Sequence, residues 1–122
     1  MTVRPEVGAT PRTCDGGVAR AFAFLGKRWN GMLLSTLADG PAGFAELTRA
    51  LPGISESVLS DRLGELVRLG LVSRTVRQGP PVGVRYELTG PGATLLPVLD
   101  ALGRWAHEHL PAEPNAVPPQ GC

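Results

Sequence analysis

The side chains best suited to chemistry lie on one side of the stretch 55–69. At about 100° per residue of an α-helix, five small or polar residues share the side opposite to a leucine stripe: Ser57, Ser60, Asp61, Gly64 and Arg68. Small residues permit close approach to a base, a hydroxyl donates or accepts, a carboxylate accepts from cytosine, and a guanidinium binds phosphate or guanine. Two interpretations stay open: a face that contacts nucleic acid, or an ordinary solvated helix face.

Cys14 is the second candidate for chemistry, because it directly precedes the first predicted helix. The positive end of a helix dipole favours the thiolate and Arg12 adds to this effect, whereas the Asp15 carboxylate opposes it. Cys14 is therefore either a redox-sensing thiol or a small apolar filler. Cys122, near the end of a Pro-rich tail, is either a partner for Cys14 in a thiol switch or an incidental residue.

Other reactive groups are few. His107 and His109 are two residues apart and point in different directions on a helix, and the two cysteines form no zinc-type spacing. No paired general acid and base occurs in register. We therefore expect no enzyme activity, no metal site and no cofactor.

The helices and strands that position these residues are predicted from the spacing of hydrophobic residues and from the Gly and Pro residues that end each element. Helices are expected over 15–26, 29–40, 43–51, 55–69 and 95–110, and strands over 71–77 and 84–89. Ser55 is expected to cap the fourth helix and is also a candidate DNA contact, and Gly70 is expected to end the helix. The leucine stripe of that helix should face the core: Leu59, Leu63 and Leu66. Pro97 either starts the last helix or kinks it.

This order predicts a winged helix-turn-helix, mainly α with a small β-hairpin (α+β). The helices 43–51 and 55–69, joined by the turn Pro-Gly-Ile-Ser, form the helix-turn-helix. A helix about 10–12 Å across fits the major groove of DNA, and a wing reaches the flanking backbone or minor groove. We therefore expect 55–69 in the major groove and the hairpin 77–85 on the backbone.

The length of 122 residues fits one domain. We expect a flexible arm over 1–13, the winged domain with dimerisation helices over 14–110, and a disordered Pro-rich tail over 111–122. The net charge is +1, so bulk charge alone does not indicate nucleic acid. No stretch reaches the roughly 18 apolar residues of a bilayer span and no signal-type run is present. We expect a cytoplasmic protein without membrane contact.

The sequence resembles the HxlR-type family of bacterial winged helix-turn-helix regulators. The matching segments are Cys14, 25–29, 37–74, 80–81, 84–89 and 95–105. The resemblance implies a homodimer that binds a palindromic operator on double-stranded DNA, often as a repressor. It also implies that some members sense electrophiles or oxidants through a cysteine equivalent to Cys14.

The sequence departs from the family pattern at three places. Asp15 follows Cys14 where the family often has proline, the wing tip 80–83 lacks a basic residue, and Gly64 replaces a common basic residue. The expected phosphate contacts are the three arginines of the strands: Arg74, Arg77 and Arg85. Arg62 lies at the edge of the leucine stripe, where it either ties helices together or touches DNA.

The first and last helices are expected to form the dimer interface. Its candidate residues are Phe22, Leu99, Leu102 and Trp105. A two-fold dimer doubles a short recognition surface. A pocket lined by Trp29, Phe22 and Trp105 is a candidate site for a small aromatic effector.

We thus expect a DNA-binding regulator with Cys14 as a sensor. Two alternatives stay open. The first is a regulator that responds to a small molecule and has no redox role. The second is a winged-helix module that binds a protein instead of DNA.

Overall fold

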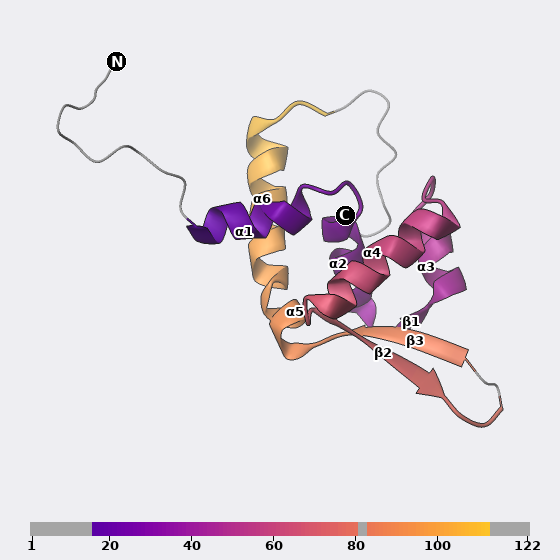
Figure 1. Ribbon diagram of the computed structural model, residues 1–122. Coiled ribbons are helices and arrows are strands. Elements are labelled where there is room, and N and C mark those ends of the chain that lie inside the picture. Colours follow the sequence, from indigo (N-terminus) through magenta and orange to yellow (C-terminus); the bar gives the residue numbers. More distant parts are fainter. Residues whose placement is uncertain (1–15, 81–82, 113–122) are drawn as a thin grey trace, which may run out of the picture.

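The computed structural model describes residues 16–80 and 83–112. Along this chain the order is α1 (Gly16–Leu25), α2 (Asn30–Thr36), the 3-10 turn η1 (Leu37–Asp39), β1 (Ala42–Gly43), α3 (Phe44–Ala50), α4 (Glu56–Arg68), β2 (Val72–Arg77), β3 (Gly83–Leu88), α5 (Gly90–Thr94) and α6 (Leu96–His109) (Figure 1). The predicted winged helix-turn-helix is confirmed. The arm 1–13, Cys14 and Cys122 lie outside the described residues, and so does all of the tail 111–122 except its first two residues.

The helix-turn-helix packs around α4, whose ends match the expected signals. The Ser55 side chain accepts a hydrogen bond from the Val58 backbone N–H at 3.1 Å. Gly70, just past the helix, has a φ of 79°, a left-handed conformation that favours glycine. The leucine stripe is fully buried, as predicted: Leu59, Leu63 and Leu66. It packs in one core with leucines of α2 and α3.

The wing belongs to a three-stranded antiparallel sheet of order β1-β3-β2. The hairpin was predicted, but β1 was not, because two residues show no alternating pattern. β1 pairs Ala42 with Tyr86, so it covers the outer edge of β3. At the base of the hairpin Val72 is buried and pairs with Leu88, which joins the sheet to the core.

The return from the wing contains a short helix that was not expected from the sequence. Thr89 caps α5 by accepting from the Gly92 backbone N–H at 3.1 Å, and its hydroxyl donates to the Gly70 carbonyl oxygen at 2.6 Å. Pro97 lies in the first turn of α6 and starts that helix, which decides between the two expected roles.

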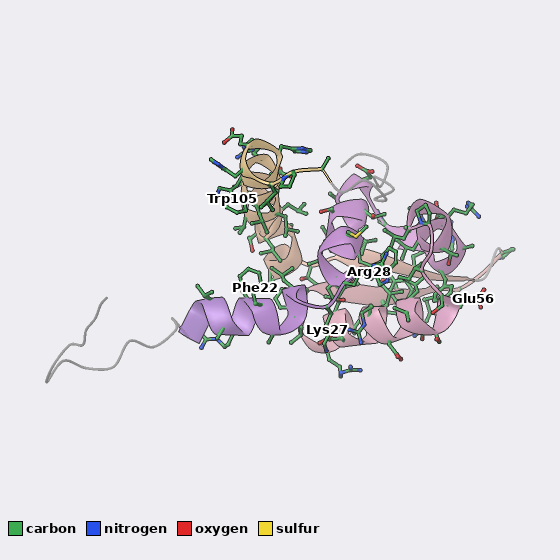
Figure 2. All side chains as sticks on the ribbon, turned by 90° about the horizontal axis from the view of Figure 1, so that it is seen from above. Phe22, Lys27, Arg28, Glu56 and Trp105 are labelled. Atoms are coloured by element: carbon green, nitrogen blue, oxygen red, sulfur yellow. The ribbon has the colours of Figure 1, made fainter. Side chains whose placement is uncertain are left out.

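Two helices lie at the margin of the core. Neither α1 nor α6 contains a buried residue, and α1 projects away from the body (Figures 1 and 2). α6 lies against α2 on the side away from the wing (Figure 1). Within the described residues, no helix has the length and apolar character to cross a bilayer.

Candidate nucleic-acid interface

The polar side of α4 faces outward. Four of its predicted contact residues are exposed: Ser57, Ser60, Asp61 and Arg68. Gly64 is half-buried, and Ser55 is exposed at the cap. Seen from above, α4 runs along one edge of the molecule from Glu56 (Figure 2). One helix therefore presents small side chains, hydroxyls, a carboxylate and a guanidinium on a surface that can enter a groove.

The three strand arginines do not share a face. Strand residues alternate between faces, and the register places Thr75 opposite Arg85 and Arg74 opposite Tyr86. Arg77 and Arg85 therefore lie on one face of the hairpin. Arg74 lies on the other face with Tyr86, which packs against the core. The alternation of strand residues could have predicted that Arg74 lies on a different face from Arg77. We had predicted the three arginines as phosphate contacts from their charge alone.

Arg85 is already engaged within the protein. Its Nη2 donates to the Pro41 carbonyl oxygen at 2.9 Å and lies 3.8 Å from the Glu46 carboxylate. Arg77 has no ion pair within the described residues. Arg77 is therefore the freer of the two guanidiniums on that face.

Arg62 takes part in a polar network centred on Glu65. Its Nη1 lies 3.5 Å from Glu65 Oε1, and its Nε is buried without a hydrogen-bond partner among the described residues. Lys27 Nζ donates to Glu65 Oε2 at 2.8 Å. The buried Asn30 side chain donates both to Glu65, at 3.2 Å, and to the Phe24 carbonyl oxygen, at 2.8 Å. The network joins the segment between α1 and α2 to α4. Arg62 therefore takes part in holding these elements together, which is one of its two expected roles.

Glu65 is the ionised centre of this network. The hydrogen bond from Lys27 holds the pKa of the Glu65 carboxyl below its ordinary value of 4.5, and the Asn30 hydrogen bond and the charges of Lys27 and Arg62 act in the same direction. Desolvation opposes them. The carboxylate therefore stays charged to a lower pH than that of an ordinary glutamate.

A cleft of about 410 Å³ lies beside the network, on the flank of α4. It is lined by Lys27, Arg28, Trp29, Val58, Asp61 and Arg62. The Arg28 guanidinium carbon lies 4.8 Å from the centre of the Trp29 ring. Lys27 and Arg28 were not among the predicted site residues. Their signals in the sequence were an adjacent basic pair and a place in the family-matching segment 25–29, and the fold was needed to place that pair next to α4.

The candidate dimer residues lie on α1 and α6. Phe22, Leu102 and Trp105 are 56%, 44% and 50% exposed, whereas Leu99 is partly buried against the core. Between these helices and α2 lies a largely apolar groove of about 330 Å³, and its lining includes Phe22, Leu99 and Leu102.

The prediction of one pocket lined by Trp29, Phe22 and Trp105 is wrong. Trp29 is 8% exposed and belongs to the core. It lines the cleft on α4, whereas Phe22 lines the groove between α1, α2 and α6. Trp105 lines neither cavity and instead lies against His109, with 5.6 Å between ring centroids. The spacing of aromatics along the chain could not show that Trp29 and Phe22 line different cavities.

The predicted thiol sensor stays a prediction, because Cys14 and Cys122 lie outside the described residues. α1 begins at Gly16, two positions after Cys14. Among residues 16–80 and 83–112, no group of three or more His, Cys, Asp or Glu side chains has a metal-binding arrangement.

A family model, a sequence relative and two solved structures all match this chain over most of its length. The sequence model of the family described as HxlR-like helix-turn-helix matches residues 24–114. The HTH-type transcriptional regulator YodB of Bacillus subtilis (strain 168) is 43% identical over 88 residues, 72% of this chain and 79% of the relative. The solved reduced form of YodB superposes with a TM-score of 0.74 at 38% identity, covering 85% of this chain and 100% of that one. The redox regulator HypR in its reduced form gives a TM-score of 0.71 at 32% identity, covering 76% and 92%.

Proposed function

The chain belongs to the HxlR-like helix-turn-helix family of transcriptional regulators, and we propose that it represses transcription as a homodimer with α4 of each protomer in the major groove. One observation carries this proposal. The apolar side of α4 is buried while its small polar side is exposed, directly before a hairpin that extends from the body. This is the arrangement that reads base edges with a helix and holds the backbone with a wing.

The homodimer is supported by the apolar surface of α1 and α6. Five large apolar side chains on these helices are between 44% and 57% exposed: Val18, Phe22, Val98, Leu102 and Trp105. Burial of apolar area drives most stable association. A two-fold axis through these helices presents two copies of α4, and two equivalent helices read a palindromic operator.

The proposed signal is oxidation of Cys14. Two solved relatives are described by redox state, one as a reduced form of YodB and one as the redox regulator HypR. Loss of two electrons and two protons from Cys14 and a second thiol, given to an oxidant such as diamide, forms a disulfide. Cys14 of the partner or Cys122 supplies the second thiol. The same regulator acts in the cytoplasm, where thiols are kept reduced until an oxidant arrives.

A second candidate signal is a small apolar molecule in the groove between α1, α2 and α6. The groove of about 330 Å³ supports it, because it adjoins the helices proposed to form the dimer. Replacing Cys14 with Ser separates the two signals. If Cys14 is the redox sensor, DNA binding by the Ser variant no longer changes when diamide is added. If the signal is a bound effector, DNA binding by the Ser variant responds as it does in the wild type.

The experiment is a DNA-binding titration with the full chain. Wild-type protein is added to the duplex upstream of its own gene and to a random duplex of equal length, at several salt concentrations. We expect tighter binding to the upstream duplex, steep weakening with salt, and loss of binding in Ser60→Glu, which places a negative charge on the exposed side of α4. Circular dichroism verifies that the variant folds. Equal binding to both duplexes by the wild type contradicts a sequence-specific regulator, and binding to neither duplex favours a module that binds a protein.

A further inference from the structure

We propose that the cleft between the segment 26–29 and α4 binds a DNA backbone phosphate, with Arg28 as its principal cation. This inference rests on the proposed DNA-binding function and adds a site on the flank of α4. The wing does not include it, and it shares only Asp61 with the polar face of α4.

The position of the cleft favours a backbone contact. An α-helix about 10–12 Å across nearly fills a major groove about 12 Å wide. Groups that touch the flank of the helix, between its buried and its exposed sides, therefore meet the sugar–phosphate wall of the groove. The cleft lies on that flank, because it is lined by Val58, Asp61 and Arg62 of α4, which are three and four residues apart.

The charge of the cleft favours an anion. It brings together three cations: Lys27, Arg28 and Arg62. Lys27 and Arg62 share the Glu65 carboxylate. Arg28 is exposed and has no carboxylate partner within the described residues. Its guanidinium lies over the Trp29 ring, which limits its motion while leaving its N–H donors open.

The hydrogen bonding of Arg62 is incomplete. Its Nε has no acceptor and its Nη1 makes a single long ion pair of 3.5 Å. Arg62 lines the cleft, so a phosphate oxygen bound there adds a negative charge beside its guanidinium group. The Asp61 carboxylate is the opposing group, and its place on the polar side of α4 leaves it to accept a hydrogen bond from a base.

The proposal predicts a contact that is independent of base sequence. Binding of wild type, Arg28→Gln and Arg28→Lys is measured by fluorescence anisotropy on a random duplex of about 30 bp and on the upstream duplex, from low to high salt. Arg28→Gln should weaken both complexes by a similar factor, about tenfold per lost contact at about 0.1 M salt, and reduce the slope of log K against log salt by about 0.9 per contact. Arg28→Lys should restore most of the slope.

Arg104→Gln is the matched control, because Arg104 is an exposed arginine on α6 in a cavity away from α4. It should leave affinity and slope unchanged. Arg28 also lines the groove between α1, α2 and α6, so sedimentation and thermal unfolding are measured for each variant.

Three results overturn the inference: an unchanged slope in Arg28→Gln, a loss confined to the upstream duplex, or a loss that accompanies dissociation or unfolding. Failure of the wild type to bind any duplex would instead reject the proposed function.

Discussion

Glu65 shows how one residue joins two parts of this protein. Its carboxylate accepts from Lys27 and Asn30 and faces Arg62. Asn30 in turn holds the carbonyl oxygen of Phe24 near the end of α1. The end of a helix at the proposed dimer interface is thereby fixed against the proposed recognition helix.

The lowered pKa of Glu65 gives a pH-dependent stability. A carboxyl whose pKa is lower in the folded state stabilises that state above its ordinary pKa, here 4.5, and this contribution disappears as the pH falls through the lowered value. Glu65→Gln should therefore reduce the free energy of unfolding at pH 7 by about 1 kcal/mol or less, as for other partly exposed pairs.

Urea unfolding at pH 7 and at pH 3 measures this effect. The difference between wild type and Glu65→Gln should shrink at pH 3. Glu87→Gln, an exposed hairpin carboxylate without an ion pair within the described residues, is the control. A difference that is equal at both pH values contradicts the role given to the charge.

The two arginines on one face of the wing should behave differently. Arg77→Gln should lower DNA affinity and the salt slope while leaving the melting temperature unchanged, because its guanidinium has no ion pair within the described chain. Arg85→Gln should also lower the melting temperature, because it removes the contacts to Pro41 and Glu46. Anisotropy and calorimetry on both variants check this; a stability loss in Arg77→Gln equal to that in Arg85→Gln is the contrary result.

At the scale of elements, α5 depends on a close approach that only glycine permits. A Cβ on Gly92 would overlap the backbone carbonyl of Leu71 at the base of β2. Gly92→Ala should destabilise the fold by about 1–3 kcal/mol, as overpacking does. Gly90→Ala is the matched control, since a Cβ on Gly90 would meet nothing within 4 Å. Chemical denaturation compares the two variants, and equal stability would show that α5 approaches the start of β2 less closely than the structure has it.

Most elements could be predicted because their signals are local. The leucine stripe, the Ser55 cap and Gly70 define α4 within one segment, and the change from helical to alternating spacing marks the hairpin. β1 exists only because β3 offers it an open edge. α5 has a Gly-Pro-Gly start with poor helix propensity, and it forms through the Thr89 cap.

The candidate site was predictable on α4 and less so elsewhere. The exposed side of α4 follows from helical periodicity, which one segment of sequence contains. The surroundings of Arg28 and Arg85 depend on residues far away along the chain, at Arg62 and Pro41. Such contacts are set by packing, and no local pattern records them.

At the scale of the whole molecule, the proposed dimer buries the exposed apolar surface of α1 and α6. A charged residue in a buried interface costs several kcal/mol without a partner. Leu102→Asp should therefore convert the proposed dimer to a monomer in sedimentation at micromolar concentration. Val76→Asp, a 50% exposed apolar position on the hairpin, should leave the dimer intact. A stable dimer in Leu102→Asp would place the interface elsewhere.

Selection of bound duplexes from a random-sequence pool tests most directly whether α4 reads DNA. The wild type should enrich a palindrome whose half-site centres are about 10–10.5 bp, or a multiple of that, apart. Ser57→Ala and Asp61→Asn should change the preferred bases within each half-site, and Arg77→Gln should leave them unchanged. An enriched sequence that is identical for the wild type and both α4 variants, or no enrichment at all, would contradict the account.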